Sequence, residues 1–276
     1  MKIQVDTYFD GNQLHTEGPY ILEIEQGKYC TVVQGRDPDA DRQVGFLMPT
    51  AVESHAHLFL DGDELNPLSR SDYLKRPREQ LLDCATANVE RYRVAGITTI
   101  RDAGDIHGIN QELRDRFAGS GTRIIAAGAG LRKAKRYGSF FAHKIEAYDS
   151  LAAAVSARAK QSDEIKIVLT GIIDFENGIV KGEPQFTLSE TQEIVTTAHD
   201  LGLRVFAHCS GLDGLRIAVD AGVDSIEHGF FMNREILDTM AEKKLAWTPT
   251  LLPVHVQWAH PEYCGWSPST VDKLRG

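Results

Sequence analysis

Residues 48–57, Met48-Pro49-Thr50-Ala51-Val52-Glu53-Ser54-His55-Ala56-His57, form an apolar run that ends in two histidines one residue apart. Because residues i and i+2 lie on the same face of a β-strand, the run predicts that His55 and His57 project together from one strand end as a pair of potential metal ligands. Taken alone the pair is weak evidence, because a chain with ten histidines contains His-x-His often by chance. Its meaning depends on what other strand ends carry.

The composition is that of an ordinary globular protein. The 276 residues include 42% hydrophobic and 25% charged residues, and the formal charge is −9. A chain of this length can bury a substantial core. Dispersed negative charge argues against nucleic acid or an anionic membrane as the partner, so a small-molecule substrate is expected; a homo-oligomer stays open.

The sequence predicts a cytoplasmic protein without a membrane span. Residues 1–6 lack the apolar run of a signal peptide, and no later run is long and apolar enough to cross a bilayer. The cysteines are few, scattered and without a Cys-x-x-Cys spacing, which favours reduced thiols: Cys30, Cys84, Cys209 and Cys264.

Two regions of different character are expected. Residues 21–25 and 28–33 read as short strands around a turn, so residues 1–45 are predicted to form a small β-domain, itself incomplete. From residue 46 to residue 276, strand-like runs alternate with amphipathic helical stretches, as in a parallel sheet buried on both faces. After the first run, the expected strands are 97–100, 124–127, 165–169, 205–208, 224–228 and 245–248, and the expected helices include 151–160, 189–201, 212–221 and 234–243.

The helix boundaries carry local signals that favour a barrel. A capping Thr187 or Ser189 precedes Glu190, and Gly202 and Gly222 stand where two helices should stop. Strand, helix and glycine stop recur about every 20 to 40 residues, which favours a (β/α)8 TIM-type barrel over an open doubly wound sheet, although periodicity alone cannot separate them. Seven strands are found, so the predicted fold class is an α/β barrel that lacks its last strand.

Strand ends then supply a set of candidate ligands. In such a barrel the carboxyl ends of the strands meet at one mouth, which would bring together His55, His57, Lys166, His208 and His228. Several imidazoles at one barrel mouth suggest a zinc-type site. Lys166 is unexpected in a buried strand because burying an ammonium is costly. Either it reaches solvent or pairs with Glu164, or burial lowers its pKa and the neutral amine takes up carbon dioxide as a carbamate that bridges two metals.

These segments resemble the amidohydrolase superfamily. The motifs that carry the resemblance are His55-Ala56-His57, residues 96–104 (GITTIRDAG), residues 165–167 (IKI), residues 206–208 (FAH) and residues 222–229 (GVDSIEHG). Within the superfamily they look most like imidazolonepropionase-related and Xaa-Pro dipeptidase-like hydrolases. The resemblance runs from about residue 21 to about residue 250 and, as an ordered set, the motifs are highly specific.

The resemblance implies a metal-dependent hydrolase that cleaves a C–N bond in an amide, cyclic amide or dipeptide. It implies two Zn²⁺ ions, or another divalent metal, with His55 and His57 on one ion, His208 and His228 on the other, and carboxylated Lys166 bridging them. Lys166, His208 and His228 are thus the expected catalytic residues.

The chain departs from the family at its carboxyl end. The family places an aspartate after the eighth barrel strand, as a metal ligand and proton acceptor, and this chain reaches Gly276 before such a strand. Asp272 lies in a polar, helix-like context and does not substitute for it. We therefore expect a carboxyl-terminally truncated chain that binds metal but has much reduced activity.

Residues that follow the strands are candidates for binding substrate. His143 and Tyr137 come after the third strand and could hydrogen-bond a carbonyl oxygen, and Asp174 or Glu176 could bind a cationic substrate. Trp258 belongs to a stretch expected at the mouth. For each of these, an ordinary structural or solvated role is the alternative. The basic run 132–136 could bind a carboxylate or be merely solvated.

Two other functions remain open from the sequence. One is a mononuclear deaminase or imidazolonepropionase-like hydrolase in which Lys166 is only structural. The other is an inactive truncated fragment or a binding protein, because the expected aspartate is missing.

Overall fold

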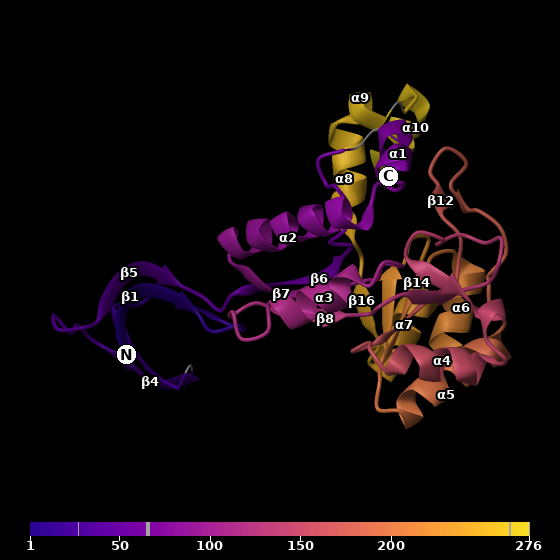
Figure 1. The fold of residues 1–276 in the computed structure, drawn as a ribbon. Coiled ribbons are helices and arrows are strands. Elements are labelled where there is room, and N and C mark those ends of the chain that lie inside the picture. The colour runs from indigo at the N-terminus through magenta and orange to yellow at the C-terminus, as the bar shows by residue number, and fades with distance from the viewer. Residues whose placement is uncertain (27, 65–66, 265, 276) are drawn as a thin grey trace. The chain divides into compact units, whose positions relative to one another are not determined.

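The protein is described from a computed structural model that covers residues 1–276 except 27, 65–66, 265 and 276. The chain forms two compact units, Met1–Ala51 and Val52–Gly276, which are treated separately below. Figure 1 shows the helices and strands of both units. The predicted α/β class is confirmed, since parallel strands alternate with helices in the second unit.

The amino-terminal unit is a single sheet. Its strand order is β2-β1-β3-β4, and β5 pairs in parallel with β1. The strands are β1 (Lys2–Phe9), β2 (Leu14–His15), β3 (Tyr20–Glu25), β4 (Lys28–Gln34) and β5 (Arg42–Leu47). The expected strand pair is confirmed as the antiparallel pair β3 and β4. Ile3, Val5 and Leu22 are buried, whereas every residue of β4 is exposed.

The second unit contains two sheets, in which the strand pairs with a known register are parallel, in place of the one continuous sheet expected of a barrel that lacks its last strand. The first has the order β6-β7-β8 and the second β10-β9-β11-β14-β15-β16. The strands are β6 (Ala51–Ala56), β7 (Ile97–Asp102), β8 (Arg123–Ala126), β9 (Gly130–Arg132), β10 (Ala142–Lys144), β11 (Ile165–Val168), β14 (Val205–Cys209), β15 (Ser225–His228) and β16 (Ala246–Thr248). All seven strands expected for the barrel are present, together with the short β9 and β10.

A break after the third expected strand separates the two sheets. β8 pairs with β7, and β9, which begins four residues after β8 ends, pairs with β11. At the break Gly128 has a φ of +65°, and its carbonyl accepts hydrogen bonds from the Asp105 backbone N–H and the Asn110 side chain. A barrel that lacks its last strand is expected to be open between its first and seventh strands, and in the described ranges β6 and β16 are indeed outer strands. They belong to separate sheets, so the break after β8 is the difference from the expected fold.

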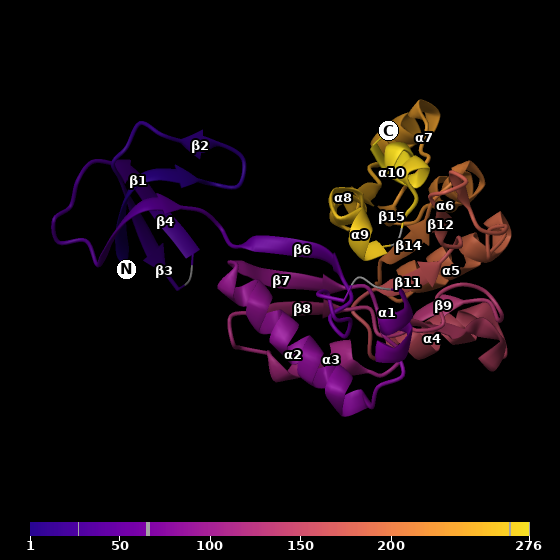
Figure 2. The same ribbon diagram turned by 90° about the horizontal axis from the view of Figure 1, so that it is seen from above.

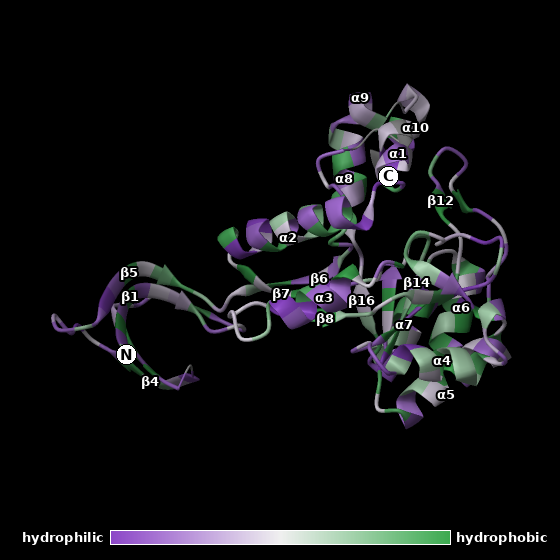
Figure 3. Ribbon diagram, in the orientation of Figure 1, coloured by the Kyte–Doolittle hydropathy of each residue, from purple (hydrophilic) through white to green (hydrophobic). Residues whose placement is uncertain are grey.

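Helices lie against the strands as the sequence pattern predicts. The helices are α1 (Pro67–Tyr73), α2 (Arg78–Val94), α3 (Ile109–Arg116), α4 (Leu151–Ala159), α5 (Leu188–Asp200), α6 (Leu212–Ala221), α7 (Arg234–Lys243), α8 (Leu251–Ala259), α9 (Pro261–Cys264) and α10 (Pro268–Arg275), with a 3₁₀ turn, η1 (Ile145–Ala147), and a hairpin of β12 (Ile173–Asp174) and β13 (Ile179–Val180). Figure 2 shows α2 and α3 beside the β6-β7-β8 sheet. In α2, hydrophilic and hydrophobic residues alternate (Figure 3), and Leu81, Ala85 and Val89 are its buried side chains.

The expected helix signals are confirmed. Thr187 caps α5 by accepting from the Glu190 backbone, and the Glu190 side chain accepts from the Thr187 backbone, which completes a capping box. Gly202 and Gly222 follow α5 and α6 with φ of +75° and +76°, a conformation that glycine adopts at low cost. Asp272 lies in α10, in agreement with its helix-like context.

Apolar side chains fill the interior on both faces of the larger sheet. All four residues of β11 are buried, and its Ile165 and Ile167 pack in one cluster with residues of β14 and of helices α4 to α7. A separate cluster joins the β6-β7-β8 sheet to α2 and α3. Each cluster thereby holds the strands of its own sheet against the helices that cover them.

Candidate active site

Four histidines meet at the carboxyl ends of three strands. His55 belongs to β6, which His57 follows directly, while His208 lies on β14 and His228 ends β15. Ring centroids are 5.6 Å apart for His55 and His57, 5.0 Å for His55 and His228, and 4.5 Å for His208 and His228. The structure thus brings together all four imidazoles named from the sequence.

Each imidazole uses one ring nitrogen in a hydrogen bond. His55 Nδ1 lies 2.5 Å from Glu227 Oε2, and His57 Nδ1 lies 2.7 Å from the Gly104 carbonyl oxygen. A carboxylate or carbonyl oxygen only accepts, so both rings carry the proton on Nδ1 and keep the Nε2 lone pair.

The other two rings are held in a similar way. His208 Nε2 donates to the Gly171 carbonyl oxygen at 3.3 Å, which leaves Nδ1 with its lone pair. His228 Nδ1 lies 2.7 Å from the Thr250 hydroxyl. Hydrogen bonds of this type fix the tautomer and orientation of metal-binding histidines.

All four histidines are neutral at pH 7. Burial is the main cause: it lowers the pKa of His55 to about 4 and that of His208 to about 3, and the positive field of Lys166 adds to the effect. Burial also lowers the pKa values of His57 and His228 well below the ordinary value. Neutral imidazole is the form that binds metal ions.

Lys166 lies in the interior at the centre of the larger sheet. Its side chain is 2% exposed on β11, and Nζ lies 4.6 Å from the centre of the Phe206 ring. Burial lowers the pKa of Lys166 to about 7, although Glu227 acts in the opposite direction. The alternatives of a solvent-reaching or Glu164-paired lysine are wrong, because Lys166 is buried and Glu164 binds Arg101 Nε at 2.5 Å.

A buried ionic network lies behind His55. Glu227 is fully buried and accepts from His55, from Arg101 Nη1 at 2.9 Å and from the Ser225 hydroxyl at 2.6 Å. Arg101 forms ion pairs with both Glu164 and Glu227. Sequence reasoning missed Glu227 and Ser225. The signal was available: Ser225 and Glu227 share one face of a strand that ends in His228, and a glutamate there needs a buried partner.

Asp102 supports the loop that follows His57. Its buried carboxylate accepts from the backbone N–H groups of Leu58 and Gly104, both at 2.8 Å, and from Asn110 at 3.0 Å. The carbonyl of Gly104 in turn accepts from His57. Asp102 therefore holds the backbone on both sides of His57's hydrogen bond, at Leu58 and at Gly104.

Aromatic side chains cover one side of the histidines. The Tyr137 ring lies 5.1 Å from that of His208, and the Phe141 ring lies 5.0 Å from that of His57. Burial raises the pKa of Tyr137, so its hydroxyl stays protonated and can donate a hydrogen bond.

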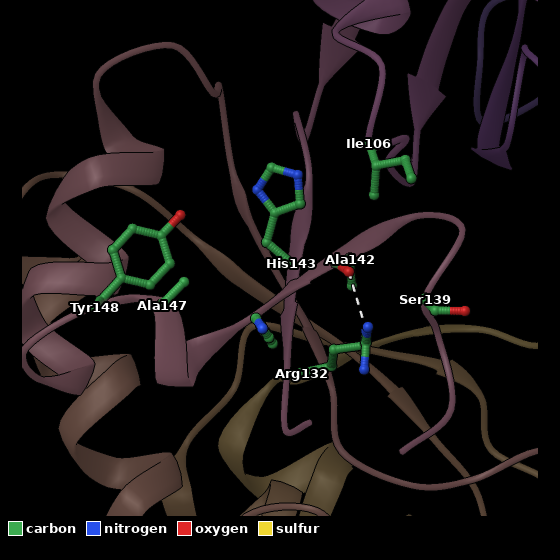
Figure 4. A pocket seen from close by; sticks show the side chains of 8 residues that line it. Ile106, Arg132, Ser139, Ala142, His143, Ala147 and Tyr148 are labelled. Atoms are coloured by element: carbon green, nitrogen blue, oxygen red, sulfur yellow. Dashed lines mark hydrogen bonds between the residues drawn. The ribbon is translucent and has the colours of Figure 1, made fainter. Parts of the chain in front are cut away.

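The other substrate-binding candidates lie elsewhere. His143 lines a cavity of about 390 Å³ together with Arg132, Ser139 and Tyr148 (Figure 4), and its Nδ1 contacts Arg158 at 3.4 Å. Arg132 donates to the Ala142 carbonyl oxygen in the same cavity.

Asp174, in β12, binds Asn177 and lies 3.6 Å from Lys181. The ring of Trp258, in α8, meets that of His255 edge to face, with the ring centroids 5.2 Å apart. Among the described residues, these contacts of Asp174 and Trp258 do not involve any of the four histidines. The exposed Glu176 lies in the β12–β13 turn. In the basic run, Lys133 forms an ion pair with Glu190 at 2.7 Å.

The donor set fits a divalent metal, but the side chains do not converge as a complete metal site. Within the part of the chain that the structure describes, no three His, Cys, Asp or Glu side chains are arranged to hold an ion. Neutral imidazoles with a free ring nitrogen are nonetheless the ligands that zinc prefers. Unmodified Lys166 contributes no oxygen ligand, so a bridge between the imidazole pairs would require its carboxylation.

None of the helices in the described part of the chain is long and apolar enough to span a membrane.

Comparisons with known proteins agree with this fold. Residues 46–258 match the amidohydrolase family. Uncharacterized proteins of Mycobacterium tuberculosis and Mycobacterium bovis are 30% identical over 237 residues, which cover 84% of this chain and 57% of theirs. This chain thus spans little more than half the length of these relatives.

Solved structures similar to this chain include several hydrolases. A Xaa-Pro dipeptidase with bound methionine in its active site is 25% identical, with a TM-score of 0.77 over 100% of this chain and 73% of its own. Two further structures share the fold, a prolidase complexed with N-methylphosphonate-L-proline and the A. niger ochratoxinase. Each is 20% identical with a TM-score of 0.77 over 99% of this chain, and the match covers 72% and 69% of their own chains, respectively. The organisation around the four histidines and the match over residues 46–258 lead to one conclusion: the chain belongs to the amidohydrolase family.

Proposed function

We propose that His55, His57, Lys166, His208 and His228 form the metal centre of a hydrolase that cleaves a C–N bond in a small-molecule amide, cyclic amide or dipeptide. The observation that carries the proposal is the cluster of four neutral imidazoles, each with only one nitrogen engaged in a hydrogen bond. Similarity to the Xaa-Pro dipeptidase supports a dipeptide among these substrate classes.

Two divalent ions, zinc by ligand preference, fit the donor set. His55 and His57 would hold one, and His208 and His228 the other. When bound, such ions lower the pKa of water and polarise the scissile carbonyl. The histidines are held for this role by their second nitrogens, which donate to fixed oxygens of Glu227, Gly104 and Gly171.

Lys166 would join the two pairs of histidines. With a pKa of about 7, a large fraction of its amine is neutral at physiological pH. The amine nitrogen adds to the carbon of carbon dioxide, forms an N–C bond and releases a proton. The carbamate formed has one negative charge and two oxygens, which are suitable ligands for two cations.

Tyr137 would bind the substrate. It is the hydroxyl-bearing ring against His208, and burial keeps it protonated. Its O–H would donate a hydrogen bond to the substrate carbonyl oxygen. This hydrogen bond would strengthen as negative charge develops on that oxygen.

A mononuclear hydrolase is the second candidate. The contact between Lys166 Nζ and the Phe206 ring is a cation–π arrangement, which favours an ammonium with a structural role. In that case Lys166 would carry no carboxyl group and would bind no metal.

Metal analysis of variants separates these proposals. The chain is loaded with Zn²⁺ in bicarbonate buffer, freed of excess metal, and its zinc content is measured. We expect about two zinc ions per chain for the wild type, both lost in Lys166→Ala, because the bridge holds them jointly. The matched control Lys160→Ala removes an exposed lysine at the end of α4 and should bind zinc like the wild type.

Each other outcome has a definite meaning. One zinc ion in both the wild type and Lys166→Ala favours the mononuclear hydrolase. A wild-type chain that binds no zinc above the level of a His55→Asn, His57→Asn variant contradicts the proposal. Cleavage of Xaa-Pro dipeptides, N-acyl amino acids and cyclic amides is assayed in parallel to identify the substrate class.

A further inference from the structure

Glu227 is a fully buried carboxylate whose two oxygens are both used. Oε2 lies 2.5 Å from His55 Nδ1, while Oε1 accepts from Arg101 Nη1 at 2.9 Å and from the Ser225 hydroxyl at 2.6 Å. A carboxylate that already accepts three charge-assisted or hydroxyl hydrogen bonds is poorly suited to bind a metal ion directly.

We infer that Glu227 is a positioning residue that fixes the ring orientation and tautomer of His55, so that Nε2 of His55 is the nitrogen left for a ligand. The inference rests on the proposed function only in naming a metal as that ligand. The hydrogen bond itself assigns the Nδ1 proton, because Glu227 can only accept.

The position of Glu227 is itself determined by a rigid support. Arg101 Nε donates to Glu164 at 2.5 Å, and the guanidinium carbon lies 3.8 Å from the centre of the Phe206 ring. A planar guanidinium held between two carboxylates and an aromatic face has little freedom. Glu227 therefore presents its oxygen to His55 from a fixed point.

Strand pairing places Glu227 beside His208, among the four histidines. β15 pairs with β14 in the register Glu227 with His208, and Ser225 and Glu227 point to the same side of β15. The next residue, His228, ends the strand with a φ of +72°, and its ring lies 5.0 Å from that of His55. β15 thus carries both a proposed metal ligand, His228, and the residue that orients another proposed ligand, Glu227 beside His55 of β6.

The test compares Glu227→Gln with a control in the same network. Glu227→Gln keeps the size of the side chain but removes its charge and lets an amide N–H face the ring. Glu164→Gln removes a carboxylate from the far side of Arg101 without touching His55. Circular dichroism and thermal unfolding show whether both variants fold.

The first readout is the tautomer of His55 in metal-free protein, from long-range ¹H–¹⁵N spectra assigned with a His55→Asn variant. We expect the proton on Nδ1 in the wild type and in Glu164→Gln, and a mixture of tautomers in Glu227→Gln. A proton on Nε2 in the wild type overturns the inference, and this result does not depend on whether any variant folds.

The second readout is the affinity for Zn²⁺, measured by competition with a chromophoric chelator. Glu227→Gln should bind zinc about 10–100-fold more weakly, as expected when the support of a ligating histidine is lost. Glu164→Gln should stay within about threefold of the wild type, because its amide oxygen can still accept from Arg101 Nε and Glu227 keeps its contact with His55. Equal affinity of folded Glu227→Gln and wild type overturns the positioning role. If the wild type binds no zinc, the proposed function fails, while the tautomer measurement still decides the inference.

Discussion

At the scale of single residues, the site depends on backbone groups that hydrogen bonds and close packing hold in one conformation. Gly104 is an example: its N–H is held by Asp102, its carbonyl accepts from His57, and its φ is +115°. A Cβ at this position would lie 3.0 Å from the Gly128 carbonyl oxygen and 3.1 Å from that of Phe141. Two backbone oxygens leave no room for a side chain.

Gly104→Ala should therefore destabilise the protein by about 3 kcal/mol or more, because backbone strain and steric overlap act together. The control is Gly96→Ala, at a φ of +80° with nothing within 4 Å of the added Cβ; it carries the strain alone and should cost about 1–2 kcal/mol. Urea unfolding measures both. Equal losses for the two variants would show that the close approach at Gly104 is not important.

At the scale of elements, α5 shows how local sequence determines a helix boundary. Thr187 and Glu190 form a reciprocal capping box, and Glu190 also binds Lys133 beyond β9. The cap therefore connects a helix terminus to the loop that carries Tyr137.

Thr187→Ala removes the side-chain acceptor of this box and should lower the free energy of unfolding by about 1 kcal/mol. Thr197→Ala is the matched control: it removes a half-buried threonine of the same helix whose hydroxyl donates back to the Glu193 carbonyl oxygen. Because alanine has the higher helix propensity, the control should be neutral or slightly stabilising. The measurement is chemical denaturation, and a control as destabilised as Thr187→Ala would contradict the capping role.

At the scale of the whole molecule, the buried histidines should make the metal-free protein sensitive to acid. Their folded-state pKa values are depressed, for example to about 3 for His208 from an ordinary 6.5, so between these values the unfolded chain binds more protons than the folded one. Stability is then highest above about pH 6.5 and falls as the pH decreases toward 4. Asp102 acts in the opposite direction, since burial raises its pKa to about 7.

The difference between the wild type and His208→Asn isolates one histidine from these opposing effects. The free energy of unfolding of the wild type, measured in urea from pH 8 to pH 5 without metal, should decrease more steeply with acid than that of the variant. Parallel curves would mean that His208 titrates alike in the folded and unfolded states.

Much of the fold was predictable from residue patterns. The strands expected at residues 97–100 and 205–208 and the helices expected at 212–221 and 234–243 are present, because apolar periodicity and glycine stops act within a few residues. The break at Gly128 was not predictable, because it depends on hydrogen bonds from Asp105 and Asn110, which lie in a different segment.

The sequence by itself determined the element types, their order and the kinds of side chain at the strand ends. Only the tertiary structure decided that Glu227 supports His55, that Asp102 holds the loop after His57 and that Tyr137, not Asp174 or Trp258, lies against the imidazoles. The physical reason is that propensity and periodicity are local, whereas the burial of a charge and the choice of its partner are determined by strands far apart in the chain.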